Sequence, residues 1–174
     1  RKMDNFKIQE INLDIIDSNP INSQIFSLDN IEGLAKVIEE EGLRSAIEVY
    51  LKDDGRYEII SGHRRYAAMN LLGKKEIPCI ISSVNDPAKI KKLLISSNLS
   101  ARITTPMEMA YAIQAYKEAV EEEGLNGYKS TRQKVADYFG ISESKVYRYE
   151  ALLKLIPELQ ELCKNPSFQY SALQ

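Results

Sequence analysis

Apolar and polar residues alternate in two different ways along the chain. Up to about residue 85, short apolar runs separated by turn residues predict strands and helices in alternation. The strands are expected at residues 8–16, 47–51, 57–60 and 77–82, and the helices at residues 30–41 and 66–72. From Pro87 onward, apolar residues recur at helical spacing, which predicts helices at residues 88–97, 106–123, 131–139, 143–156 and 157–163. The pattern therefore indicates an α+β domain over residues 1–98, followed by an all-α domain over residues 99–174.

Residues that begin or end helices support several of these boundaries. Ser27 or Asp29 supplies an N-cap for the helix at residues 30–41, and Gly42 follows its end, where a left-handed residue is common. Pro106 suits the first turn of the helix that it opens.

Residues 131–149 have the pattern of a helix-turn-helix. Ala136 is small where two helices would cross, and Gly140 tolerates the positive φ that a tight turn requires. Ser142 is a natural N-cap for the second helix, whose exposed residues would face base edges in the major groove. The predicted DNA-binding residues are Arg132, Gln133, Ser142, Glu143, Ser144, Lys145, Tyr147 and Arg148.

The distribution of charge supports this interpretation more than its sum does. The whole chain carries a net charge of −2, but residues 128–154 contain six basic and three acidic residues, a local net charge of +3. A helical hairpin that belongs to a core and never contacts DNA is the alternative. The spacing of Ala136, Gly140 and Val146, together with the cap and the basic excess, favours DNA binding.

A second candidate site begins at Ser61-Gly62-His63-Arg64-Arg65, where a predicted strand leads into a helix. Backbone N–H groups at a helix N-terminus attract anions, and the guanidinium groups of Arg64 and Arg65 suit phosphate. The spacing alone fits equally well with two solvated arginines on a first helical turn.

Another polar cluster, Ser96-Ser97-Asn98 followed by Arg102, lies at the predicted domain boundary, where ligand sites often form. The alternative is that Asn98 caps the end of a helix.

Composition excludes some classes of protein. The only histidine is His63, and Cys79 and Cys163 are far apart, so a His/Cys metal site is not expected. No apolar run approaches the ~20 residues that span a bilayer. Two lone cysteines are typical of a reducing compartment, and we expect a cytoplasmic protein with no membrane partner.

These motifs, in this order, resemble the ParB family of DNA-partition proteins over nearly the whole chain. Residues 62–68, Gly-His-Arg-Arg-Tyr-Ala-Ala, are similar to the family's Gly-Glu-Arg-Arg box. Asn98 and Arg102, followed by the helix start at Pro106, resemble its Glu-Asn-x-x-Arg box and the helix after it. Residues 33–49 resemble its first nucleotide motif, with Gly42 as the glycine, and residues 152–157, Leu-Leu-Lys-Leu-Ile-Pro, resemble the tail of its helix-turn-helix domain.

The resemblance implies a ParB/sulfiredoxin-like N-terminal domain that binds CTP, followed by the helix-turn-helix domain. It implies that the nucleotide-binding residues are Gly42, Gly62, His63, Arg64, Arg65, Ser97, Asn98 and Arg102. It further implies a homodimeric DNA clamp at a specific, palindromic site on double-stranded DNA of a nucleoid or plasmid, with a partition ATPase as a partner. The family's C-terminal dimerisation domain is expected to be absent from this chain.

The chain departs from the family at two carboxylates. His63 and Ser97 stand where the two boxes have glutamate, and these carboxylates serve magnesium and the triphosphate in the family. We therefore expect CTP binding without effective Mg²⁺ binding, and hydrolysis that is weak or absent. The reactive cysteine of sulfiredoxin also falls on His63, so that enzyme activity is not expected.

Three functions remain open at this point. The first is a partition clamp switched by CTP, which the overall similarity to the family favours. The second is a ParB-like transcription regulator of a mobile element without a working nucleotide switch, which the altered boxes favour. The third is a phosphotransferase, which would need a carboxylate that the boxes lack.

Overall fold

The computed structural model describes residues 7–101, 104–124, 129–165 and 167. The chain divides into two units between Leu94 and Ile95, inside helix α4 (Pro87–Ala101). The predicted domain boundary at residue 98 lies in the same helix. Because α4 continues to Ala101, the alternative role of Asn98 as a helix cap is wrong.

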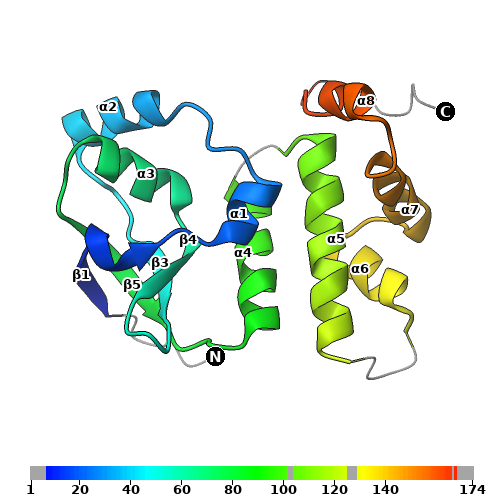
Figure 1. The fold of residues 1–174 in the computed structure, drawn as a ribbon, viewed down its shortest axis with the longest axis horizontal. Coiled ribbons are helices and arrows are strands. Elements are labelled where there is room, and N and C mark those ends of the chain that lie inside the picture. Colours follow the sequence, from blue (N-terminus) through cyan, green and yellow to red (C-terminus); the bar gives the residue numbers. More distant parts are fainter. Residues whose placement is uncertain (1–6, 102–103, 125–128, 166, 168–174) are drawn as a thin grey trace. The chain divides into compact units, whose positions relative to one another are not determined.

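Unit 1 (Arg1–Leu94) is built on a five-stranded mixed sheet (Figure 1). Its strands are β1 (Ile8–Asn12), β2 (Ile16–Asp17), β3 (Ile47–Leu51), β4 (Tyr57–Ser61) and β5 (Glu76–Ser82), in the spatial order β1-β5-β3-β4-β2. β3 pairs parallel with β5 and antiparallel with β4. The single strand predicted over residues 8–16 is wrong, because a 3-10 turn (Leu13–Ile15) capped by the side chain of Asn12 separates β1 from β2.

The other elements of unit 1 are helices α1 (Pro20–Ile25), α2 (Ile31–Glu41) and α3 (His63–Leu71), with the first part of α4. Helix α1 is not among the predicted elements. Asn19 begins it, because its Oδ1 accepts a hydrogen bond from the backbone N of Ile21 at 2.9 Å. Helix α2 follows Asn30, which makes no side-chain cap bond, so the predicted caps Ser27 and Asp29 are wrong.

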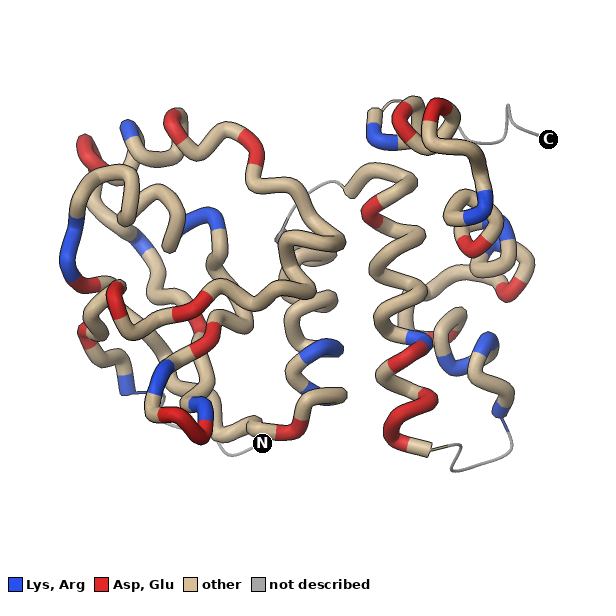
Figure 2. Tube along the Cα trace, in the orientation of Figure 1, with Lys and Arg blue, Asp and Glu red and all other residues tan. Residues whose placement is uncertain are grey.

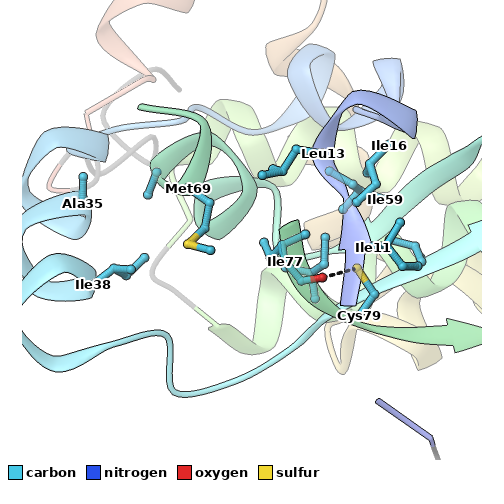
Figure 3. Packing of buried hydrophobic residues seen from close by; sticks show 12 residues of the cluster. Ile11, Leu13, Ile16, Ala35, Ile38, Ile59, Met69, Ile77 and Cys79 are labelled. Carbon is cyan, nitrogen blue, oxygen red and sulfur yellow. Dashed lines mark hydrogen bonds between the residues drawn. The ribbon is translucent and has the colours of Figure 1, made fainter. Parts of the chain in front are cut away.

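The core of unit 1 lies between the sheet and helices α2 and α3, which pack against each other beside it (Figures 1 and 3). Both Ile59 and its neighbour Ile60 are 0% exposed. Because successive side chains of a strand point to opposite faces, β4 is covered on both faces. The labelled cluster in Figure 3 includes Ala35, Ile38, Ile59, Met69 and Ile77.

The described elements of unit 2 (Ile95–Gln174) are all helical: the end of α4, then α5 (Pro106–Glu122), α6 (Thr131–Phe139), α7 (Glu143–Leu152) and α8 (Pro157–Leu162). Thr105 and Glu108 form a capping box at the start of α5. Helix α7 ends at Leu152 and not at the predicted residue 156. Beyond it, Gln160 Nε2 donates to the carbonyls of Leu152 and Leu155 at 3.4 and 3.0 Å, which satisfies backbone acceptors where the chain leaves the helix.

Helix α3 begins at a close approach to strand β3. Gly62, the residue before the helix, has a φ of 105°. A Cβ atom added at Gly62 would lie 2.5 Å from Cγ2 of Ile47, a residue that is 0% exposed. Both the backbone conformation and the contact therefore require glycine at this position.

Gly62→Ala should lower the free energy of unfolding by about 2–5 kcal/mol, because backbone strain and overpacking of the core add together. Gly73→Ala is the matched control. Gly73 also has a positive φ, of 64°, but nothing lies within 4 Å of an added Cβ. Gly73→Ala should therefore lower the free energy of unfolding by only about 1–2 kcal/mol. Urea unfolding measures both, and equal losses would show that the contact with Ile47 does not constrain α3.

Candidate functional site

Two of the predicted nucleotide segments meet in unit 1. Arg65, in the first turn of α3, donates through Nη1 to the carbonyls of Ser45 and Ala46 at 3.0 and 2.5 Å, and to Ser45 Oγ at 2.7 Å. Arg65 therefore fixes the segment between Gly42 and β3 against the start of α3. This contact brings together motifs that are about twenty residues apart in the sequence.

His63 lies in a buried polar network. It is 5% exposed, and its Nε2 accepts a hydrogen bond from the backbone N of Asn19 at 3.3 Å. The side chain of Asn19 donates to Glu58 Oε1 at 2.7 Å, and the hydroxyl of Tyr50 donates to the same oxygen at 2.7 Å. The network ties α3 and the sheet to the segment that begins α1. The sequence pattern did not reveal Asn19 as the partner of His63, or Glu58 and Tyr50 as further members of the network, because the three lie on separate elements.

Burial gives His63 an unusual acid–base property. It lowers the pKa of His63 from its ordinary value of 6.5 to about 4. The imidazole is therefore neutral at neutral pH, as the hydrogen bond from Asn19 to Nε2 requires. In this structure His63 holds the backbone of Asn19, and its predicted contact with nucleotide stays a prediction.

Arg64 has a donor that is not used. Its Nε is a buried polar atom without a hydrogen-bond partner, the one such side-chain atom in the part of the chain that the structure describes. Helix α3, which Arg64 helps to begin, also has no side-chain cap. An uncapped helix N-terminus beside an unpaired guanidinium N–H favours an anion.

The remaining predicted nucleotide residues are distributed differently. Gly42 ends α2 with a φ of 80° and is exposed, and an added Cβ there would meet nothing within 4 Å. Ser97 and Asn98 are half-buried residues of α4 in unit 2. Arg102 lies outside the described residues. The structure therefore brings Gly62, Arg64 and Arg65 together with the segment that follows Gly42, all within unit 1.

Helices α6 and α7 in unit 2 are joined by a short turn with satisfied backbone groups. Gly140 has a φ of 65°, and the N of Ile141 donates to the carbonyl of Ala136 at 3.0 Å, which closes the end of α6. Ser142 Oγ accepts from the N of Lys145 at 3.2 Å and caps α7, so Ser142 has a structural role at its side chain. Val146 is 0% exposed between the helices.

The outer face of α7 carries most of the predicted DNA-binding residues. Lys145 and Gln133, which is on α6, are exposed. The ring of Tyr147 is large and apolar, yet the residue is 60% exposed. An open hollow of about 410 Å³ is lined by Arg132, Glu143, Ser144, Tyr147 and Arg148. The fold therefore gathers five of the eight predicted residues around one concave surface.

Both signs of charge occur along α6 and α7 (Figure 2). Glu150, which the sequence pattern did not single out, accepts from Lys117 Nζ at 2.8 Å and from Arg132 Nη2 at 3.3 Å. Helix α6 also packs on α5, where the rings of Tyr116 and Tyr138 stack with their centroids 3.9 Å apart.

Neither a metal-ligand cluster nor a membrane-spanning helix occurs among the described residues. These residues contain no group of three or more His, Cys, Asp or Glu side chains that could hold a metal ion. None of the helices within the described ranges combines the length and the apolar character that a bilayer crossing requires.

His63→Gln should remove a pH dependence of stability. The unfolded chain binds a proton at His63 below pH 6.5, whereas the folded chain does so only near pH 4, so the fold loses about 2 kcal/mol between pH 7 and pH 5 at this residue. Glutamine keeps an acceptor for Asn19 but does not titrate. Thermal unfolding of both proteins at pH 7 and pH 5 tests this, and parallel losses in the two would rule out His63 as the cause.

A family model and a curated relative match most of this architecture. The ParB N-terminal domain model matches residues 1–98. A nucleoid occlusion protein of Geobacillus sp. (strain WCH70) is 37% identical over 137 residues, which cover 79% of this chain and 46% of that protein. The chain thus spans about half the length of this curated relative.

Two solved structures of the C-terminally truncated chromosome-partitioning protein ParB from Caulobacter crescentus are also similar. The one complexed to the centromeric parS site is 25% identical, with a TM-score of 0.57, and the match covers 88% of this chain and 75% of that chain. The one complexed with CTP-γ-S is 26% identical, with a TM-score of 0.50, and the match covers 90% and 84%. The predicted α+β N-terminal domain is confirmed, and because the family model covers more than half of the sequence, this chain belongs to the ParB family.

Proposed function

We propose that this chain binds double-stranded DNA at a specific site, with α6 and α7 as a helix-turn-helix and α7 in the major groove. The observation that carries the proposal is the exposed face of α7, where Lys145, Tyr147 and Arg148 stand on a helix fixed by a capped turn. Side chains on the N-terminal half of such a helix reach base edges. The similar Caulobacter protein complexed to parS supports this assignment.

Lys145→Ala and Arg148→Ala should each weaken binding to the preferred duplex by about 1–3 kcal/mol if each reads a base. The preferred duplex is first selected from a random-sequence library with the unaltered chain, and affinity is then measured by fluorescence anisotropy. Lys164→Ala is the control, because Lys164 is an exposed lysine of the same unit that pairs with Glu161 on α8. Unchanged affinity in both α7 variants would remove α7 as the reading helix.

Unit 1 is proposed to bind CTP at the start of α3. The residues present fit a triphosphate, because α3 has no side-chain cap and Arg64 Nε is buried without a partner. The similar Caulobacter protein complexed with CTP-γ-S supports CTP as the nucleotide. Magnesium fits less well, because His63 and Ser97 occupy the two box positions and offer no carboxylate. We therefore propose that nucleotide binding here depends little on Mg²⁺.

Arg64→Ala and Arg65→Ala should have different effects. Arg64→Ala should weaken CTP binding by about tenfold or more with little loss of stability, since its Nε forms no bond in the fold. Arg65→Ala should also lower the free energy of unfolding, because three acceptors in the segment before β3 lose their donor.

Isothermal titration with CTP, ATP, GTP and UTP, with and without Mg²⁺, checks both variants against the unaltered chain. Unchanged CTP affinity in Arg64→Ala would show that the phosphate assignment is wrong. Selective CTP binding by the unaltered chain would support the partition clamp. Absence of binding to every nucleotide by the folded chain would support the second candidate, a DNA-binding regulator without a nucleotide switch, which the position of His63 in a structural network favours.

The assembled protein is proposed to act in DNA partition or nucleoid occlusion as a homodimer at a palindromic site, with a partition ATPase as a partner. The match to a nucleoid occlusion protein and to a chromosome-partitioning protein supports this class of function.

A further inference from the structure

A single carboxylate in unit 2 is shared by two cations. Glu150 Oε1 accepts from Lys117 Nζ at 2.8 Å, and Glu150 Oε2 accepts from Arg132 Nη2 at 3.3 Å. The three side chains come from α7, α5 and α6, so the array joins three helices of the proposed DNA-binding unit. The side chain of Glu150 is 18% exposed, whereas those of Lys117 and Arg132 are 36% and 45% exposed. The cations are therefore near solvent while the carboxylate lies behind them.

The array adjoins the surface proposed to contact DNA. The guanidinium of Arg132 lies 5.8 Å from the ring centroid of Tyr147, which is 60% exposed on the outer face of α7. Both residues line the hollow at the N-terminal half of α7 and also a larger groove of about 680 Å³ beside α5. A phosphate that approaches this surface would therefore meet an Arg132 side chain that is already paired with Glu150.

Charges around the larger groove balance. Its lining contains three basic residues, Lys117, Arg132 and Lys154, and three acidic residues, Glu118, Glu121 and Glu150. Burial alone would raise the pKa of Glu150, but the hydrogen bonds and charges of Lys117 and Arg132 outweigh burial and lower the pKa. The carboxylate is thus ionised at neutral pH, and the groove offers DNA no excess of positive charge.

This balance bears on specificity, because non-specific DNA affinity comes almost entirely from cations that neutralise phosphates, whereas sequence preference comes from contacts with bases. We propose that Glu150 is a specificity-determining residue that withholds Arg132 and Lys117 from the DNA backbone. Non-specific binding then stays weak, and base contacts from α7 decide the site. Arg132 reaches a phosphate only in a complex close enough to compete with Glu150. The inference rests on the proposed DNA binding.

Glu150→Gln tests the proposal on a mixed-sequence duplex, which requires no knowledge of the preferred site. Releasing two cations should raise affinity for this duplex by about fivefold or more and should steepen the dependence of log K on log salt by about one to two. Glu161→Gln is the matched control, since Glu161 is also ion-paired with a lysine, and its substitution makes the same change in charge on α8, outside the array of Glu150, Lys117 and Arg132. Equal effects of the two substitutions would overturn the proposal and leave only a general effect of net charge.

Arg132→Gln keeps the proposal testable even if Glu150→Gln lowers the stability that thermal unfolding reports. In the unaltered background, Arg132→Gln should change the salt slope on the mixed-sequence duplex by much less than one, because Glu150 already withholds Arg132. In the Glu150→Gln background it should reduce the slope by about one. A full reduction in the unaltered background would overturn the proposal. If the unaltered chain binds neither the mixed-sequence nor a selected duplex, the proposed DNA binding itself fails. If it binds DNA but Glu150→Gln changes neither affinity nor salt slope, only the proposal for Glu150 fails.

Discussion

The first turn of helix α3 lies directly on strand β3, and much of unit 1 depends on this approach. Gly62 allows it, because any side chain there would collide with the buried Ile47. Once the turn is fixed, Arg65 reaches the carbonyls of the segment before β3, and His63 reaches the backbone of Asn19. The turn therefore positions both neighbouring segments and leaves Arg64 with an unused, buried N–H.

The candidate site residues of the two units differ in how their side chains are used. In unit 1 His63 and Arg65 of the Gly-His-Arg-Arg segment form hydrogen bonds with other parts of the unit. In unit 2 the capping bonds of Ser130 and Ser142 fix the backbone of α6 and α7, while the outer side chains of α7 stay exposed. Preorganised backbone with exposed side chains is what recognition of a base sequence needs.

Membership of the ParB family narrows the functions that the geometry supports. The resemblance expects metal-binding carboxylates at the positions of His63 and Ser97, and the structure shows His63 as a neutral, buried residue. A phosphotransferase would need such a carboxylate, so the altered boxes count against it. The proposed binding of an anion at α3 requires none of these groups, since it would use backbone N–H groups and Arg64. The nucleotide binding proposed for this chain therefore does not depend on the carboxylates that hydrolysis would need.

The sequence by itself determined the features that depend on residues close together in the chain, namely helix starts, turns and motifs. The apolar spacing and caps located the starts of α5 to α8, and Gly140 and Ser142 indicated the turn, because caps and turns act within four or five residues. The Gly-His-Arg-Arg and helix-turn-helix motifs indicated the family. Only the tertiary structure decided which polar groups face each other. Asn19 meets His63 from 44 residues away, and Lys117 meets Glu150 from 33 residues away. The apolar pattern likewise did not predict the break between β1 and β2 or the full length of α4. Such pairs follow from how strands and helices pack across the chain, and no local periodicity encodes that packing.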